Sequence, residues 1–315
     1  MKIITLTLSP AIDIHCNTDS FIAERENFAK ITSRDVGGKG VNISRALLSC
    51  KIPSTAIVVV GEENADSFLS LLAADNIDCE AIWSQGLIRE NITVHTTGKK
   101  ETRLSFDGFV GDDSLIDEVE DSLNEIAKSG DIVALVGSIP RGINTEKVKN
   151  LVHALKSKEI RVVIDSRSFT PTDIVECSPF LIKPNEEEIT AYTKKAVESL
   201  EDATDAAKKI FEKGVENVMI SLGAKGAVLA CSEGLFIANA PLISALSTIG
   251  AGDSSIAGFL AAYKDRKSPA ECLKNAVAFG SAACLTEGTK PPKKEDIEQL
   301  IQSIKVKNRL KGVHS

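Results

Sequence analysis

The sequence contains no apolar run of the roughly 18 residues that a membrane-spanning helix needs, so we expect no membrane partner. Its seven cysteines are widely spaced and include no Cys-x-x-Cys pair. We therefore expect free thiols in a reducing cytoplasm and neither disulfides nor a cysteine-bound metal. The net charge of −7 argues against a nucleic-acid-binding surface. A small anionic substrate is not excluded, because a cleft needs only a few local cations.

Short apolar runs alternate with longer segments of helical period along the 315 residues. Several of the runs are rich in Val and Ile, as buried parallel strands are. The alternation predicts an α/β fold with a doubly wound, mostly parallel sheet and helices on both faces. Ligands of such sheets bind beyond the carboxyl ends of the strands. The predicted strands are 3–8, 55–60, 132–136, 162–165, 180–182, 218–222 and 227–229. The predicted helices are 41–48, 66–74, 114–128, 146–156, 186–193, 203–212, 253–263, 270–285 and 295–303.

Two stretches interrupt this alternation. Residues 12–35 are polar and lack a helical stripe, and residues 89–103 are typical of a hairpin with Thr97-Gly-Lys99 at its tip. They form either a small accessory sheet or two ordinary surface excursions, and the pattern alone does not decide between these. The basic segment 305–315 is expected to be frayed.

The strongest chemical signal is Gly250-Ala-Gly-Asp253, which precedes a strongly apolar helix. Glycines permit a tight turn, and the unpaired N–H groups of a helix start can hold a phosphoryl group. An ionised Asp253 beside such a turn could accept a hydroxyl proton; the alternative is a plain helix cap. The segment is neither a Walker A loop nor a dinucleotide fingerprint, since Ser255 stands where the latter needs Gly. A dehydrogenase is therefore a weak alternative.

Three further segments carry polar groups at strand exits or helix starts. Residues 37–42 (Gly-Gly-Lys-Gly-Val-Asn) place a cation and an amide at a helix start, or form a plain glycine-rich loop. Residues 183–188 (Lys-Pro-Asn-Glu-Glu-Glu) offer Glu188 as a Mg²⁺ ligand, or a capping box with Asn185. Residues 221–226 (Ser-Leu-Gly-Ala-Lys-Gly) suit a hairpin or a nucleotide edge. Arg89 and Arg103, at the ends of the predicted hairpin, suit bidentate phosphate binding or are solvated surface residues.

The order of these motifs, together with Asp13, Arg89-x-Asn91 and Gly137-Ser-Ile-Pro140, resembles the PfkB (ribokinase-like) carbohydrate kinase family from about residue 5 to residue 283. The opening Thr7-Leu-Ser-Pro-Ala-Ile-Asp13 is similar to the branch of 1-phosphofructokinases and tagatose-6-phosphate kinases. The resemblance implies an α/β core of residues 1–9, 36–87 and 110–315. It also implies a β-sheet lid of residues 10–35 and 88–109 that commonly pairs two subunits, and hence a homodimer.

The resemblance also implies roles for individual residues. Asp253 matches the catalytic base, with Gly250, Ala251 and Gly252 as its anion hole. The positions that match substrate-binding residues are Asp13, Gly38, Lys39, Asn42, Arg89, Asn91, Arg103 and Ser138. The positions that match the ATP side are Lys183, Asn185, Ser221, Gly223, Gly226 and Asn275, with Glu188 for Mg²⁺. The implied reaction is ATP-dependent phosphorylation of a ketohexose monophosphate, with fructose 1-phosphate first and tagatose 6-phosphate or fructose 6-phosphate next. A sugar-phosphate sensor without turnover is the competing class.

Four positions depart from the family pattern. Ser247 stands where an Asp often helps to bind a monovalent cation. Arg141 replaces a usual Pro, the run Asp165-Ser-Arg-Ser-Phe169 places Arg167 where a small residue or Gly is expected, and residues 105–109, ending in Phe109, replace an Asn-x-Pro-Gly-Pro-like run. The last three should lie close to the substrate.

Overall fold

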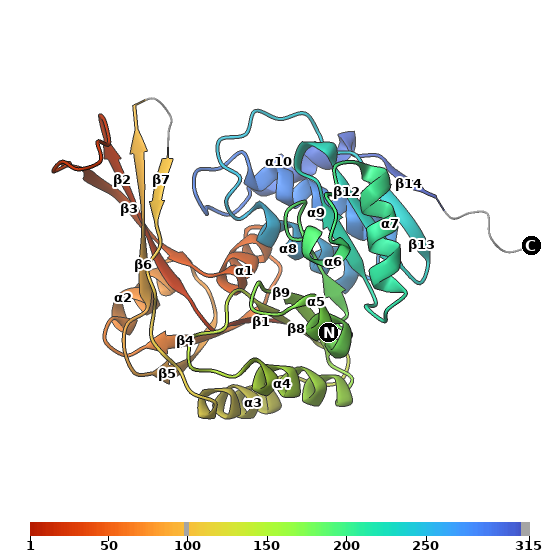
Figure 1. Cartoon of the computed structure of the whole chain (residues 1–315), viewed down its shortest axis with the longest axis horizontal. Helices are drawn as coiled ribbons and strands as arrows, with labels where there is room; N and C mark the ends of the chain where they lie inside the picture. Colours follow the sequence, from red (N-terminus) through yellow and green to blue (C-terminus); the bar gives the residue numbers. More distant parts are fainter. Residues whose placement is uncertain (98–100, 310–315) are drawn as a thin grey trace, which may run out of the picture.

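The computed structural model describes residues 1–97 and 101–309, and within them the strands form two separate sheets. The larger sheet has ten strands in the order β14-β13-β12-β11-β10-β9-β8-β1-β4-β5 (Figure 1). From β5 to β11 neighbouring strands are parallel, and from β11 to β14 they are antiparallel. The strand bounds are β1 Ile3–Thr7, β4 Thr55–Gly61, β5 Cys79–Ser84, β8 Ile132–Val136, β9 Arg161–Asp165, β10 Leu181–Ile182, β11 Val218–Ser221, β12 Ala227–Cys231, β13 Gly234–Ala238 and β14 Val306–Asn308.

Helices cover both faces of this sheet, so the predicted doubly wound α/β fold is confirmed. One face packs apolar side chains against α3, α4, α5 and α7, and the other packs them against α1, α8, α9 and α10. The sheet's central strands are buried on both faces, as their Val- and Ile-rich sequences require. The helix bounds are α1 Lys39–Ser49, α2 Ala65–Ala74, α3 Ser114–Ile126, α4 Thr145–Ser157, α5 Pro171–Cys177, α6 Thr190–Thr193, α7 Leu200–Phe211, α8 Ala251–Lys264, α9 Pro269–Ala283 and α10 Lys294–Leu300.

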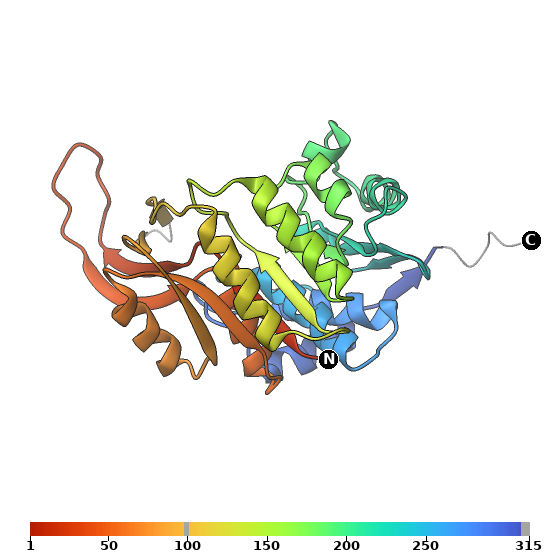
Figure 2. The ribbon, with the colours of Figure 1, turned by 90° about the horizontal axis from the view of Figure 1, so that it is seen from below.

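The second sheet has four strands in the order β3-β2-β6-β7, and it projects from one end of the molecule, opposite β14 (Figures 1 and 2). Its strands are β2 Ala11–Thr18, β3 Lys30–Gly37, β6 Arg89–Thr96 and β7 Glu101–Leu104. Of the two alternatives for these segments, the accessory sheet is therefore the right one. The hairpin tip at Thr97-Gly-Lys99 falls largely on residues 98–100, which lie outside the described residues.

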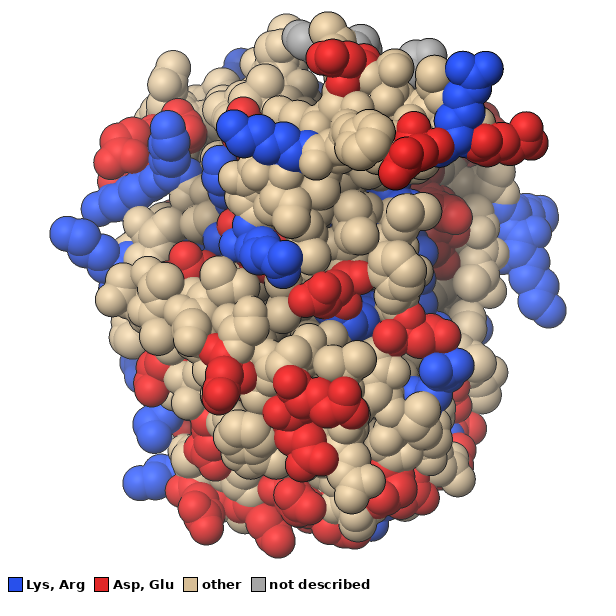
Figure 3. All heavy atoms as spheres, turned by 90° about the vertical axis from the view of Figure 1, so that its left-hand side faces the viewer, with Lys and Arg blue, Asp and Glu red and all other residues tan. Residues whose placement is uncertain are grey.

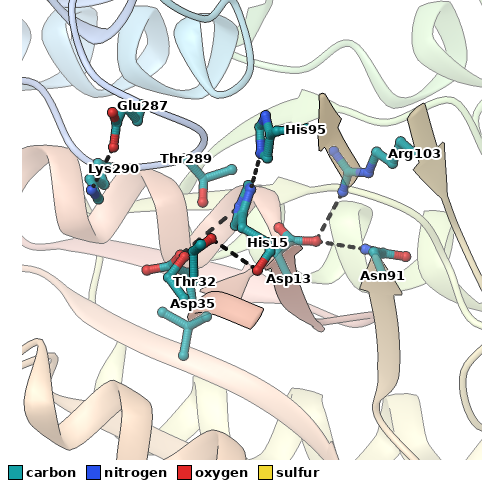
Figure 4. Close-up of polar contacts among 12 residues, drawn as sticks. Asp13, His15, Thr32, Asp35, Asn91, His95, Arg103, Glu287, Thr289 and Lys290 are labelled. Atoms are coloured by element: carbon teal, nitrogen blue, oxygen red, sulfur yellow. Dashed lines mark hydrogen bonds and ion pairs between the residues drawn. The ribbon is translucent and has the colours of Figure 1, made fainter. Parts of the chain in front are cut away.

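The faces of this small sheet differ in chemistry because side chains alternate along each strand. On one face Ile12, Ile14 and Val36 pack against Phe68 of α2 in a third apolar cluster. The other face carries Asp13 and His15 of β2 and Asn91 and His95 of β6 (Figure 4), and Asp13 and Asn91 line a cavity. This second face supplies half of the candidate site described below.

Some expected elements were wrong or missing. Residues 186–189 form turns, and only Thr190–Thr193 of the predicted helix 186–193 is helical, as α6. Strands β5, β13 and β14 and helix α5 were not predicted. The expected fraying of 305–315 is wrong for Val306–Asn308, which pairs with β13. Among the described residues, no helix combines the length and the apolar character needed to cross a bilayer.

Candidate active site

The start of α8 provides an open set of backbone donors. Gly250 caps the helix with φ 77°, a left-handed conformation that favours glycine. The amides of Gly252 and Asp253 make no hydrogen bond to any described residue. Such free amides at a helix N-terminus, reinforced by the helix dipole, bind anions. This turn can therefore receive a phosphoryl group.

Asp253 lies in the first turn of α8 and is 7% exposed. Its Oδ2 accepts a 2.8 Å hydrogen bond from the side-chain amide of Asn42. Burial raises the pKa of Asp253 to about 6, against the opposing effects of the Lys39 ammonium and the Asn42 amide. A carboxylate with a pKa near the working pH, beside an anion-binding turn, is suited to general-base chemistry.

The start of α1 brings Asn42 and Lys39 to the same place. Gly38, at φ 124°, turns the chain out of β3 and into α1. A side chain at Gly40 would meet Thr7 Oγ1 of β1 at 2.3 Å, so only glycine allows the helix to pack this closely. This local geometry, set by the glycine-rich run, places Lys39 at the carboxyl end of the central strands.

Lys39 donates a 2.9 Å hydrogen bond to Oδ2 of Asp165, the last residue of β9. Burial opposes the charge on Lys39, but Asp165 and Asp253 outweigh it and raise the pKa of the ammonium. Burial likewise opposes ionisation of Asp165, yet Lys183 and Lys39 together lower its pKa. The pair is therefore charged on both sides, and Lys39 is held beside Asp253.

Lys183 reaches the α8 turn from the other side. A Cβ at position 252 would lie 2.9 Å from Lys183 Nζ, so this ammonium lies directly against the α8 turn. Lys183 is also buried, at the exit of β10. A cation thus lies against the free amides of the α8 turn, where it adds to their attraction for an anion.

The polar face of the small sheet closes the opposite side (Figure 4). Asp13 of β2 accepts hydrogen bonds at its Oδ1 from Asn91 of β6 at 2.8 Å and from Arg103 of β7 at 3.0 Å. Arg89 donates from its Nε and Nη2 to the backbone carbonyls of Pro10 and Ser9, each at 3.3 Å. Burial lowers the pKa of Arg89, although the group stays protonated at any working pH.

The turn 183–188 has the contacts of the capping alternative. Asn185 Oδ1 accepts from the amide of Glu188 at 2.8 Å, and Glu188 Oε2 accepts from the amide of Asn185 at 3.2 Å. Glu188 Oε1 also accepts a 3.1 Å hydrogen bond from Nε of Arg167. Asn185 and Ser221 pair in an isolated β-bridge, so the turns 183–188 and 221–226 lie side by side at the carboxyl ends of β10 and β11.

These groups surround one cavity of about 420 Å³. Of the residues selected from the sequence, those lining it are Asp13, Gly38, Lys39, Asn42, Arg89, Asn91, Arg103, Lys183, Asn185, Glu188, Gly250, Gly252 and Asp253. Those that do not line it are Ser138, Ala251, Ser221, Gly223, Gly226 and Asn275. Ser138 is exposed in the turn after β8, and Asn275 donates to the backbone of Glu271 within α9.

The cavity also contains residues that were not selected, notably Asp165, Arg167 and Thr289. Asp165 and Arg167 carry a signal that was available, because Asp165 ends a predicted strand and Arg167 follows it by two residues. Both belong to the divergent run 165–169 that was expected close to the substrate. Thr289 lies in the loop after α9, where Arg45 donates to its carbonyl oxygen at 3.2 Å. No pattern in the sequence marks this contact.

The positions that depart from the family pattern have separate structural roles. Arg141 forms a 3.2 Å ion pair with Asp107, so two of the divergent runs contact each other, and both side chains are exposed. Phe109 is buried in the core against α3. Ser247 accepts a 3.2 Å hydrogen bond from the amide of Ile249 and so shapes the approach to Gly250.

The chain is similar over most of its length to known proteins. The sequence profile described as the pfkB family carbohydrate kinase matches residues 5–296. The chain is 31% identical over 306 residues to a 1-phosphofructokinase of Bacillus subtilis, covering 96% of this chain and 99% of that protein. It is 29% identical over 303 residues to the ATP-dependent 6-phosphofructokinase isozyme 2 of Escherichia coli, covering 95% and 98%. The structure of Escherichia coli phosphofructokinase-2 in complex with fructose-6-phosphate superposes with a TM-score of 0.89 at 28% identity, covering 96% and 98%.

Proposed function

Because the chain belongs to the pfkB family of carbohydrate kinases and is an ATP-dependent sugar kinase, we propose that it phosphorylates a ketohexose monophosphate, with fructose 1-phosphate as first candidate and fructose 1,6-bisphosphate as product. The observation that carries this proposal is that Arg89 and Arg103 of the small sheet line the same cavity as Asp253 of α8. Two guanidinium groups suit a phosphate dianion, whereas a neutral sugar needs mainly amides and carboxylates.

The reaction needs a base, a cradle for the transferred phosphoryl group and charge neutralisation. Asp253 accepts the proton of the substrate hydroxyl while the oxygen of that hydroxyl attacks the terminal phosphorus of ATP. The free amides of Gly252 and Asp253, with Lys183 beside them, stabilise the transferring group. Lys39 neutralises charge on the sugar side, and ADP leaves with the bond to the terminal phosphate broken.

We propose that the nucleotide lies along the turns 183–188 and 221–226, with Asn185, Ser221, Gly223 and Gly226 on its phosphates and ribose and Asn275 beside the base. The contact between these turns supports a continuous binding edge. The donor set also fits Mg²⁺, since the cavity wall carries the oxygen groups of Asp165, Asn185 and Glu188. Of these, Glu188 is our proposed ligand. A bound Mg²⁺ supplies charge neutralisation between the phosphates.

Fructose 6-phosphate or tagatose 6-phosphate, phosphorylated at O1, is the second candidate. The similarity to 1-phosphofructokinases supports the first candidate. The similarity to the 6-phosphofructokinase isozyme 2 supports the second candidate equally specifically.

A coupled assay of ADP release with MgATP tests the assignment. Fructose 1-phosphate, fructose 6-phosphate, tagatose 6-phosphate and free fructose are compared by kcat/KM. We expect fructose 1-phosphate to rank first and free fructose last. A higher kcat/KM for a 6-phosphate would select the second candidate, and binding of a sugar phosphate without ADP release would identify a sensor.

We propose that the small sheet, with segments 10–35 and 88–109, acts as a lid and pairs two subunits in a homodimer. Support comes from large apolar side chains exposed on and beside it, namely Phe21, Ile22, Phe28, Ile31, Leu104 and Phe106. Figure 3 shows this side of the molecule, where charged groups of both signs surround uncharged areas. A cytoplasmic location remains part of the proposal, supported by the similarity to metabolic kinases.

A further inference from the structure

Arg167 places an additional cation at the nucleotide side of the cavity. It follows β9 by two residues and lines the cavity together with Lys39 and Lys183. Unlike those lysines, Arg167 has a largely exposed side chain, with an exposed fraction of 70%. Its Nε donates to Glu188 Oε1 at 3.1 Å, and its Nη2 lies 4.0 Å from Oε2 of Glu187. The guanidinium thus lies over the carboxylate that we assign to Mg²⁺.

This contact leaves neither oxygen of Glu188 free. Oε2 accepts from the backbone amide of Asn185, and Oε1 accepts from Arg167. The first bond closes a turn of the backbone, so it holds Glu188 in place. The second comes from a long exposed side chain, and exposed ion pairs of this kind are readily exchanged. A hydrated cation that approaches Glu188 therefore competes with Arg167 and leaves the capping bond intact.

We propose that Arg167 is an exchangeable counter-cation: it occupies the metal-binding oxygen of Glu188 in the nucleotide-free protein and pairs with the nucleotide phosphates once Mg²⁺ takes that oxygen. This rests on the proposed function, since it requires Glu188 to serve the metal. Arginine suits both partners, because its planar fork binds carboxylate and phosphate alike. The exchange keeps a positive charge beside Glu188 at every stage and delivers a second one to the phosphates.

The first test measures Mn²⁺ binding to the protein without nucleotide or sugar, by electron paramagnetic resonance of the free ion. Arg167→Ser removes the competitor, so the Kd for Mn²⁺ should fall about two- to five-fold, the range expected for one exposed ion pair. The KM for MgATP should rise, because a phosphate contact is lost. The matched control is Arg141→Ser, which removes an exposed arginine paired with Asp107 outside the cavity. It should change neither quantity.

A double-mutant cycle separates direct competition from the general field of a positive charge. Glu188→Gln removes the negative charge for which Arg167 and Mn²⁺ compete. Adding Arg167→Ser to this variant should therefore leave its Kd for Mn²⁺ unchanged. If Arg167→Ser gives the same gain in the Glu188→Gln background, or gives none in the wild-type background, the inference is overturned. If Glu188→Gln alone leaves Mn²⁺ binding unchanged, the inference and the metal role of Glu188 both fall.

The sugar assignment is independent of these measurements. Thermal unfolding of each variant checks that it is folded, and Arg167→Lys serves as a second probe should Arg167→Ser fail to fold. Lysine keeps the charge but presents no planar fork, so its Kd for Mn²⁺ should lie between those of the wild type and Arg167→Ser. Failure of the sugar panel with a positive Mn²⁺ result would leave Arg167 assigned and the substrate open.

Discussion

The side-chain amide of Asn42 donates a 2.8 Å hydrogen bond to Oδ2 of Asp253, joining the first turns of α1 and α8. Each helix begins after a glycine with a positive φ, which is Gly38 for α1 and Gly250 for α8. The bond orients the carboxylate of Asp253, which lines the cavity. Two segments that are far apart in the sequence thereby form a single reaction centre.

Asp253→Asn should abolish most activity while keeping the fold, because an amide cannot take the hydroxyl proton. General-base loss typically lowers the rate by about 10²–10⁴, and the KM values should change much less than kcat. The control is Asp265→Asn, at the opposite end of the same helix. A variant that keeps more than half of the wild-type kcat would remove Asp253 from the mechanism.

The pH dependence should report the same group. With a pKa of about 6 in the free protein, Asp253 loses its base function as the pH falls through 6. We expect kcat/KM, measured from pH 5 to 8, to fall with a slope of one proton on the acid side. The residual activity of Asp253→Asn should lack this limb. An acid limb centred near pH 4, the ordinary value for Asp, would contradict the effect of burial.

The raised pKa also predicts a change in stability. Between about pH 4 and pH 6 the native state keeps a proton on Asp253 that the unfolded state releases, so this group's contribution to the free energy of unfolding falls as pH rises. Above that range the buried charge costs about 3 kcal/mol by linkage. Asp253→Asn should therefore be more stable than wild type at pH 7.5, and its advantage should be much smaller at pH 4.5. Urea unfolding at the two pH values checks this, and equal differences at both would contradict it.

The fold was largely predictable because its central strands are short, apolar on both faces and followed by polar turns. β1, β4 and β8 were found within two residues of their bounds. Two of the missed strands lack that signal: β5 is only partly buried, and Val306–Asn308 is a mostly exposed edge strand in a basic segment. Strand β13 was missed although its sequence is apolar and mostly buried. Helix α5 was missed despite a signal, since Thr170 and Asp173 form a capping box around Pro171.

The candidate site was predictable where function depends on backbone geometry and less so where it depends on pairing. Glycine runs marked the starts of α1 and α8 without knowledge of the fold. The Asp165–Lys39 pair joins residues 126 positions apart, and no local pattern shows it. The contact of Arg167 with Glu188 depends on two loops meeting at adjacent strand ends, which only the sheet order reveals.

Phe28→Ser should weaken a lid-mediated dimer. Phe28 lies between β2 and β3 and is 82% exposed, so it gains most from being covered by a second copy. Sedimentation at micromolar concentration should show a dimer for the wild type and a shift toward monomer for the variant. Trp83→Ser, on β5 of the large sheet, is the control with another large exposed aromatic side chain and should stay dimeric. A wild-type monomer would refute the lid interface.

The last prediction concerns the phosphate already on the substrate. Arg89 is held by the carbonyls of Ser9 and Pro10, which fix the position of its guanidinium. Asp13 and Asp107 act on its charge, but no carboxylate of the described residues forms an ion pair with it. A fixed, partly buried cation at a cavity wall gives strong charged hydrogen bonds, about 1.5–3 kcal/mol each. Arg89→Ala should therefore raise the KM for the ketohexose phosphate ten-fold or more, at about 1.4 kcal/mol per decade.

The control for this prediction is Arg34→Ala on β3, whose guanidinium pairs with Glu90 at the surface of the same sheet. It should leave the KM for both substrates nearly unchanged. In Arg89→Ala the KM for ATP should also change little, because the nucleotide turns lie across the cavity. The kcat/KM for free fructose should hardly respond, since no phosphate is present to lose its partner. If Arg89→Ala lowered kcat/KM for fructose and its phosphates equally, the arginine would be acting through the shape of the Ser9-Pro10 turn, and the phosphate assignment would fail while the kinase activity stood.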